Sequence, residues 1–171
     1  MRAPVIERPW PRTLDSGLLI ARIALGLVIF VHGWNHLFGL NGSGGLDATA
    51  AFFQRAGYHP GRAFAALDGC TELVSGLLIA VGFLLPLGAA GVVAIMLNVV
   101  WLKRSAGYSG PRGFEFELTL LLFAVALLLA GPGRLAVDRL FLGPRAGNSR
   151  FAAAAFALGV IGAAVTVGLR H

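Results

Sequence analysis

Long apolar runs separated by short polar segments make up most of the chain, and they predict an all-α bundle of transmembrane helices. The runs cover residues 17–38, 63–85, 87–102, 114–130 and 151–169. A bilayer core about 30 Å thick requires about 20 apolar residues in a helix, so we interpret each run as one membrane span. Five crossings would place the two ends of the chain on opposite sides of the membrane.

The segments between the runs contain residues that favour turns. Pro86 and Gly88 predict a tight turn that joins the second and third spans as an antiparallel hairpin, and residues 131–133 (Gly-Pro-Gly) end the fourth span. The connection 39–62 is rich in glycine, and Asp47 could cap a short helix there that lies along the membrane interface. An ordinary loop explains this connection equally well.

The first 16 residues form a polar, proline-containing segment. The apolar run that follows is too long for a cleaved signal peptide and lacks a small-residue cleavage site, so we expect a retained signal anchor. We divide the chain into an N-terminal segment 1–16, a four-helix membrane domain 17–140, and a part 141–171 that contains a basic linker and the fifth span.

Composition supports an integral membrane protein. Hydrophobic residues make up 57% of the 171 residues and charged residues 13%, and the mean hydropathy is +0.77, whereas soluble domains have about a quarter charged residues. The net charge of +6 does not indicate nucleic-acid binding, because the basic residues lie in short stretches between the spans, where they contact headgroups. The basic residues are divided almost evenly between the two membrane faces. The slight excess on the side of the N-terminus favours a cytoplasmic N-terminus. The single cysteine, Cys70, excludes an intrachain disulfide, and we expect it to be a packing residue.

Polar side chains interrupt the first four runs at similar depths. With a helical rise of about 1.5 Å per residue, His36 lies near one membrane face and Glu72 about 13 Å below it. His32 and His36 are four residues apart, as are Asp68 and Glu72, so each pair shares a helix face. The sequence therefore predicts an intramembrane polar pocket formed by His32, Asn35, His36, Asp68, Glu72, Asn98, Glu115 and Glu117.

Two interpretations of this pocket remain open. Carboxylates at such depth cost several kcal/mol unless they are paired, so the residues could form a structural network or a functional site. Two imidazoles and several carboxylates also suit a metal, but HExxH and other ligand-spaced motifs are lacking, and we assign no metal. Arg22 lies toward the opposite face, where we expect headgroup contacts, or an ion pair with an acid if the span limits shift by a turn.

Residues 22–39, 50–89, 113–129 and 131–138, taken in that order, resemble the DoxX family of small bacterial membrane proteins. The resemblance covers roughly residues 18–140, and it includes Arg22, His32-Gly33, His36, Glu72, and Glu115 or Glu117. The family's usual residue at the position of His36 is lysine. The fifth span is additional to the usual four-helix unit.

The resemblance implies a four-helix membrane bundle in the bacterial inner membrane. The family takes its name from a subunit of a thiosulfate:quinone oxidoreductase, and some members are associated with redox-stress complexes. We therefore expect a subunit or accessory of a quinone-linked or redox-stress oxidoreductase system, with a quinone as the cofactor that the pocket would hold. The alternatives are a small solute or proton transporter and a noncatalytic scaffold that recruits an enzyme through its basic loops. Expected partners are the bilayer, a soluble redox protein and a second copy of the chain.

Overall fold

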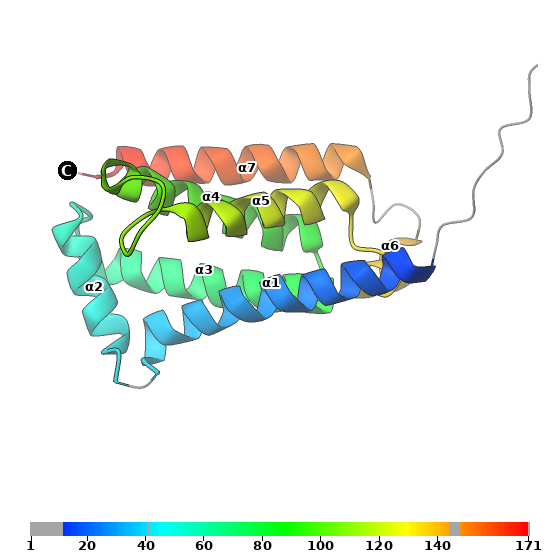
Figure 1. Cartoon of the computed structure of the whole chain (residues 1–171), viewed down its shortest axis with the longest axis horizontal. Helices are drawn as coiled ribbons and strands as arrows, with labels where there is room; N and C mark the ends of the chain where they lie inside the picture. The colour runs from blue at the N-terminus through cyan, green and yellow to red at the C-terminus, as the bar shows by residue number, and fades with distance from the viewer. Residues whose placement is uncertain (1–11, 41, 144–147, 171) are drawn as a thin grey trace, which may run out of the picture.

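The computed structural model describes residues 12–40, 42–143 and 148–170, which fold into a helical bundle (Figure 1). Residues 1–11 of the expected N-terminal segment lie outside the described residues. The long helices are α1 (Arg12–Phe38), α3 (Gly61–Val81), α4 (Leu85–Lys103), α5 (Glu115–Ala130) and α7 (Ser149–Gly168). The shorter elements are α2 (Gly45–Arg55), the 3₁₀-helix η1 (Arg104–Ala106) and α6 (Val137–Leu142). The predicted all-α bundle with an additional C-terminal helix is confirmed.

Four of the described helices are long and apolar enough to cross a membrane. The apolar stretches are Thr13–Phe38, Gly61–Val81, Leu85–Ala106 and Ser149–Gly168. Helix α5 has 16 residues and a length of about 24 Å at the usual rise, slightly less than a bilayer core. Helix α1 begins and α7 ends at opposite ends of the bundle (Figure 1). This arrangement is that of a multi-pass membrane protein.

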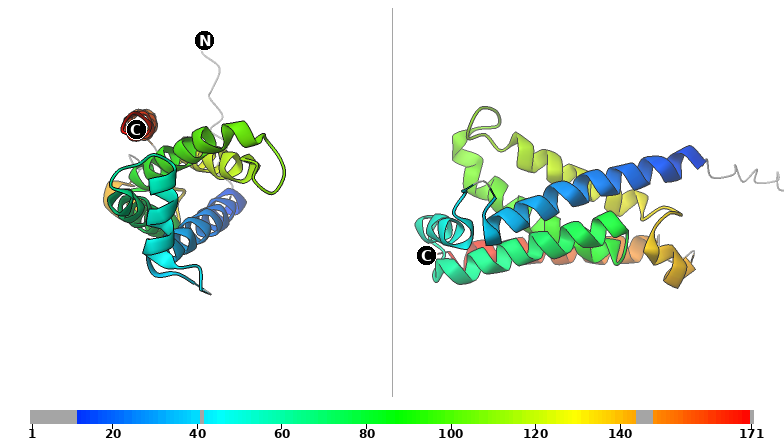
Figure 2. Two further views of the ribbon diagram at one scale, coloured as in Figure 1. Left: turned by 90° about the vertical axis from the view of Figure 1, so that its left-hand side faces the viewer. Right: turned by 90° about the horizontal axis from the view of Figure 1, so that it is seen from below.

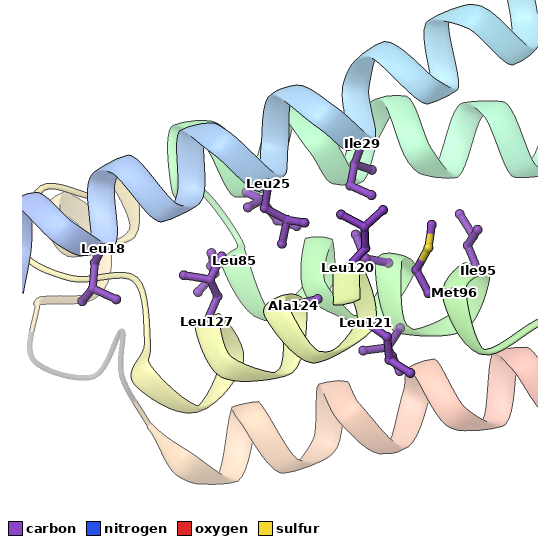
Figure 3. Close-up of a cluster of buried hydrophobic side chains, with 13 residues drawn as sticks. Leu18, Leu25, Ile29, Leu85, Ile95, Met96, Leu120, Leu121, Ala124 and Leu127 are labelled. Atoms are coloured by element: carbon purple, nitrogen blue, oxygen red, sulfur yellow. The ribbon is translucent and has the colours of Figure 1, made fainter. Parts of the chain in front are cut away.

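The hydrophobic core lies between α1, α4 and α5 (Figure 3). Leu25 and Ile29 of α1 are at most 1% exposed and face side chains of the other two helices. Those side chains include Leu85, Ile95 and Met96 of α4 and Leu120, Leu121, Ala124 and Leu127 of α5. Helix α7 packs on the outer side of α4, where small residues such as Ala155 and Ala90 allow a close approach.

Helices α1 and α3 are in close contact because glycines from both helices lie in their interface. A Cβ atom on Gly33 would lie 2.5 Å from the backbone nitrogen of Leu73 and 2.6 Å from the carbonyl oxygen of Gly69. A Cβ atom on Gly26, two turns earlier, would lie 2.6 Å from the carbonyl oxygen of Gly76. The two backbones are therefore in contact. His36 lies one turn after Gly33 and is held directly against α3.

The turn between α3 and α4 lies at residues 82–84, not at Pro86 and Gly88 as predicted. Gly82 ends α3 with a φ of 70°, a conformation that glycine adopts without steric cost, and its N–H donates to the carbonyl of Leu78. Pro86 lies in the first turn of α4, where the missing N–H removes no helical hydrogen bond.

The connection 39–62 contains the short helix that we considered, but without the predicted cap. Helix α2 lies across the end of the bundle (Figure 2). Its N-cap position is occupied by Gly44, with no hydrogen bond from a capping side chain. Asp47 lies in the first turn of the helix, where its carboxylate forms an exposed ion pair with Arg62.

Cys70 is exposed on the surface of α3 and is not the buried packing residue that we expected. An apolar side chain on a membrane-spanning helix does not have to be buried in protein, because lipid tails solvate it equally well. Hydrophobicity alone therefore does not identify the inner face of such a helix.

Candidate functional site

The side chains of His36, Asp68 and Glu72 meet between α1 and α3, at the end of the bundle near α2. Nδ1 of His36 lies 2.9 Å from Oδ2 of Asp68 and 2.9 Å from Oε2 of Glu72. Both carboxylates project from successive turns of α3 toward α1, where the glycine contact brings the helices together. The side chains of His36, Asp68 and Glu72 are 33%, 12% and 3% exposed, so the cluster is largely removed from solvent.

His36 can satisfy only one of the two carboxylates by hydrogen bonding. A carboxylate oxygen accepts, so Nδ1 of His36 must carry the proton, and it donates this proton to Asp68. Oε2 of Glu72 then has no hydrogen-bond partner among the described residues. The cluster therefore contains a buried acceptor that a cation or a ligand proton could satisfy.

A second ion pair lies on the α4 and α5 side. Nζ of Lys103 donates to Oε1 of Glu117 at 2.6 Å, and the other carboxylate oxygen of Glu117 has no hydrogen-bond partner in the described part of the chain. The ring of His32 stacks near Phe116, with 5.8 Å between the ring centroids. Nδ1 of His32 donates to the carbonyl of Val28 at 2.9 Å, which leaves Nε2 as an acceptor.

These groups line a partly open cavity of about 360 Å³, whose wall is formed by residues of α1 to α5. One part of its wall is ionisable, and the remainder is apolar and aromatic. The apolar part is formed mainly by Phe52, Phe53, Ile95, Met96, Phe116 and Leu120. Small-molecule sites commonly combine such apolar walls with a few convergent polar groups, and about 300 Å³ is the lower end of their usual volume.

The cavity brings together six of the eight residues predicted for the pocket. His32, Asn35, His36, Asp68, Glu72 and Glu117 line it. Asn98 is buried elsewhere, where its side-chain oxygen accepts a hydrogen bond from the hydroxyl of Tyr58 at 2.7 Å. Glu115 lies exposed at the start of α5. Counting residues along each helix placed both at a suitable depth, but depth does not determine how each helix is rotated about its axis.

Asn35 lines the cavity and also closes the end of α1. Its side-chain oxygen accepts hydrogen bonds from the backbone N–H of Leu40 and from the hydroxyl of Ser43, both at 2.7 Å. These bonds hold the start of the loop that leads to α2, so Asn35 helps to shape the rim of the cavity.

Arg22 lies at the opposite end of the bundle from this cluster, but it does not reach outward to headgroups. Its side chain is fully buried, and Nη2 donates to the carbonyl oxygen of Leu135 at 2.8 Å. The nearby charge is that of Asp138, which acts on the guanidinium electrostatically. The segment that precedes α6 folds back over this end of the bundle and encloses Arg22, an arrangement that the order of the spans did not predict.

Sequence reasoning missed Lys103, Tyr58 and Asp138. The sequence analysis expects the basic residues between the spans, which include Lys103, only to contact headgroups. The position of Lys103 near the end of one span, beside the acidic start of the next, could have indicated the pair with Glu117. Tyr58 and Asp138 lie in connections between the spans, and nothing in the apolar pattern indicates that they are buried.

The sequence profile of the DoxX family matches residues 17–104, from α1 to the end of α4, which is more than half of the chain. The chain belongs to the DoxX family. The DoxX match contains His36, Asp68, Glu72 and Lys103, whereas Glu117 and helices α5 to α7 lie beyond it.

Curated relatives are found in two bacteria. A protein of Mycobacterium tuberculosis named "Uncharacterized membrane protein Rv3486" is 31% identical over 146 residues, which cover 76% of this DoxX chain and 86% of the relative. A protein of Bacillus subtilis named "Putative oxidoreductase CatD" is 28% identical over 139 residues, which cover 80% of this chain and 96% of the relative. No solved structure is significantly similar to the chain.

Proposed function

We propose that this DoxX protein is a membrane subunit or accessory of an oxidoreductase system in the bacterial inner membrane, and that its cavity holds a quinone headgroup. The observation that carries the proposal is a single cavity that combines aromatic walls with His36, Asp68, Glu72 and the Lys103–Glu117 pair. The name of the Bacillus subtilis relative supports the oxidoreductase class.

A quinone requires both the apolar, aromatic part of the cavity wall and its ionisable part. Its ring is apolar and planar, so it packs against aromatic and aliphatic side chains such as Phe116 and Met96. Its carbonyl oxygens need hydrogen-bond donors. The ammonium group of Lys103 can supply them beside its bond to Glu117, and His36 can donate through Nε2 when its ring carries both protons. Reduction to the quinol adds protons, and Glu117, Asp68 and Glu72 are positioned at the cavity to exchange them, while the electrons come from a partner oxidoreductase.

The test is whether quinone copurifies with the full chain in mild detergent. After solvent extraction and mass spectrometry, we expect bound quinone in the wild type and at least about tenfold less in His32→Ala and Glu117→Gln, because each loses a polar group at the cavity wall. Glu115→Gln and His59→Gln are matched controls, since both side chains lie outside the cavity, and they should retain the quinone.

Wild-type protein that contains no quinone, and that also fails to bind an added short-chain quinone in a fluorescence titration, would contradict the proposal. Equal quinone content in Glu117→Gln and Glu115→Gln would place any bound quinone somewhere other than this cavity.

A further inference from the structure

The cluster of His36, Asp68 and Glu72 has a feature that quinone binding does not explain. One Nδ1 atom lies 2.9 Å from an oxygen of each of two carboxylates, although it carries a single proton. The three atoms lie within 4.8 Å of one another. Such convergence of one nitrogen and two carboxylate oxygens is the arrangement that metal ligands adopt around a shared ion.

We propose that His36, Asp68 and Glu72 bind a divalent first-row transition-metal ion. Imidazole nitrogen and carboxylate oxygen bind such ions at about 2.0–2.2 Å, so two ligands at a right angle lie about 3.0 Å apart. With 2.9 Å between Nδ1 and each carboxylate oxygen, and all three atoms within 4.8 Å of one another, the ligands need little movement to surround one ion. A mixed nitrogen and oxygen set favours ions such as Mn²⁺, Fe²⁺, Co²⁺ and Zn²⁺.

The charge of the cluster supports the same conclusion. Asp68 and Glu72 are 12% and 3% exposed, and Oε2 of Glu72 is a buried acceptor with no hydrogen-bond partner among the described residues. The ammonium group of Lys103 is already paired with Glu117. On binding, a divalent cation would take the place of the proton on Nδ1 of His36, which leaves to solvent, and would neutralise the two carboxylates. It would also provide a partner for Oε2 of Glu72, which lowers the cost of burying negative charge at this depth.

The three proposed metal ligands all come from the α1 and α3 side of the cavity. His36 belongs to α1 and both carboxylates belong to α3, and all three line the cavity. A metal ion held in this way would keep coordination positions open toward the cavity, as in sites where a metal binds a further ligand. The inference goes beyond the proposed function and stands without it, because the ion can bind whether or not a quinone enters the cavity.

The experiment uses full-length protein in detergent, depleted of metal with a chelator and then titrated with Mn²⁺. Binding is measured by the loss of the free-ion signal in electron paramagnetic resonance. We expect about one ion per chain in the wild type and at least about tenfold weaker binding in His36→Ala and Glu72→Gln, because each loses a ligand. Asp47→Asn is the matched control, since its carboxylate pairs with Arg62 on the surface, and it should bind as the wild type does.

A second measurement needs no variant. Pulsed electron paramagnetic resonance of the Mn²⁺-loaded wild type should show coupling to an imidazole nitrogen, which a folding defect in a variant cannot mimic. Wild-type protein that does not bind Mn²⁺, Co²⁺ or Zn²⁺, or bound Mn²⁺ without nitrogen coupling, would overturn the proposal. Metal binding without any quinone binding would overturn the proposed function alone, and the reverse result would overturn the metal site alone.

Discussion

Replacing Asp138 by alanine is expected to lower the free energy of unfolding by about 3–5 kcal/mol, because it leaves two buried backbone N–H groups without an acceptor and the buried charge of Arg22 without a nearby counter-charge. The Asp138 carboxylate is 2% exposed and accepts hydrogen bonds from the backbone N–H groups of Leu84 at 2.7 Å and Leu85 at 3.0 Å. These are donors at the start of α4 that no helical carbonyl can satisfy. The same carboxylate acts on the charge of Arg22, whose Nε and Nη1 atoms have no hydrogen-bond partner among the described residues.

The measurement is thermal unfolding in detergent, followed by circular dichroism. Asp47→Ala is the control, because Asp47 is 80% exposed in its ion pair and its loss should cost less than about 1 kcal/mol. The double variant Arg22→Met with Asp138→Ala should recover part of the stability, since it removes the buried charge together with its partner. Equal melting temperatures for Asp138→Ala and Asp47→Ala would contradict the role assigned to Asp138.

Gly33→Ala is expected to destabilise the bundle by about 3 kcal/mol, because overpacking a close contact forces the structure to shift. The added methyl group would meet the backbone of α3 at 2.5 Å from the nitrogen of Leu73 and 2.6 Å from the oxygen of Gly69. Backbone atoms cannot rotate away as the end of a side chain can. Helices α1 and α3 would have to separate, and His36 would move away from the carboxylates of α3.

Gly17→Ala is the matched control, since Gly17 also lies in α1 and a Cβ atom there has no neighbour within 4 Å. Alanine is the better helix former, so this substitution should leave the melting temperature unchanged or slightly higher. Thermal unfolding of both variants tests the stability, and a Mn²⁺ titration tests whether the cluster remains assembled. A Gly33→Ala protein as stable as Gly17→Ala would show that the helices are not in contact there.

The membrane class and the helical architecture follow from the sequence alone. Long apolar runs in a chain with 13% charged residues have no stable soluble arrangement, and in lipid the backbone must satisfy its hydrogen bonds within each helix. The helical periodicity of the sequence was also sufficient to predict which residues form part of the cavity wall. The four-residue spacing from Asp68 to Glu72 places the two carboxylates on one helix face, whatever that helix packs against.

The tertiary structure decided how the helices are rotated and which polar groups meet. Depth along a helix follows from counting residues, but rotation depends on neighbouring helices, and in a membrane hydrophobicity does not distinguish the inner face from the lipid face. For this reason Glu115 and Cys70 are exposed, contrary to expectation, and Lys103 joins Glu117 at the cavity. Only the folded chain brings Leu135 and the α6 residue Asp138 close to the buried Arg22, because both lie more than 110 positions from Arg22 in the sequence.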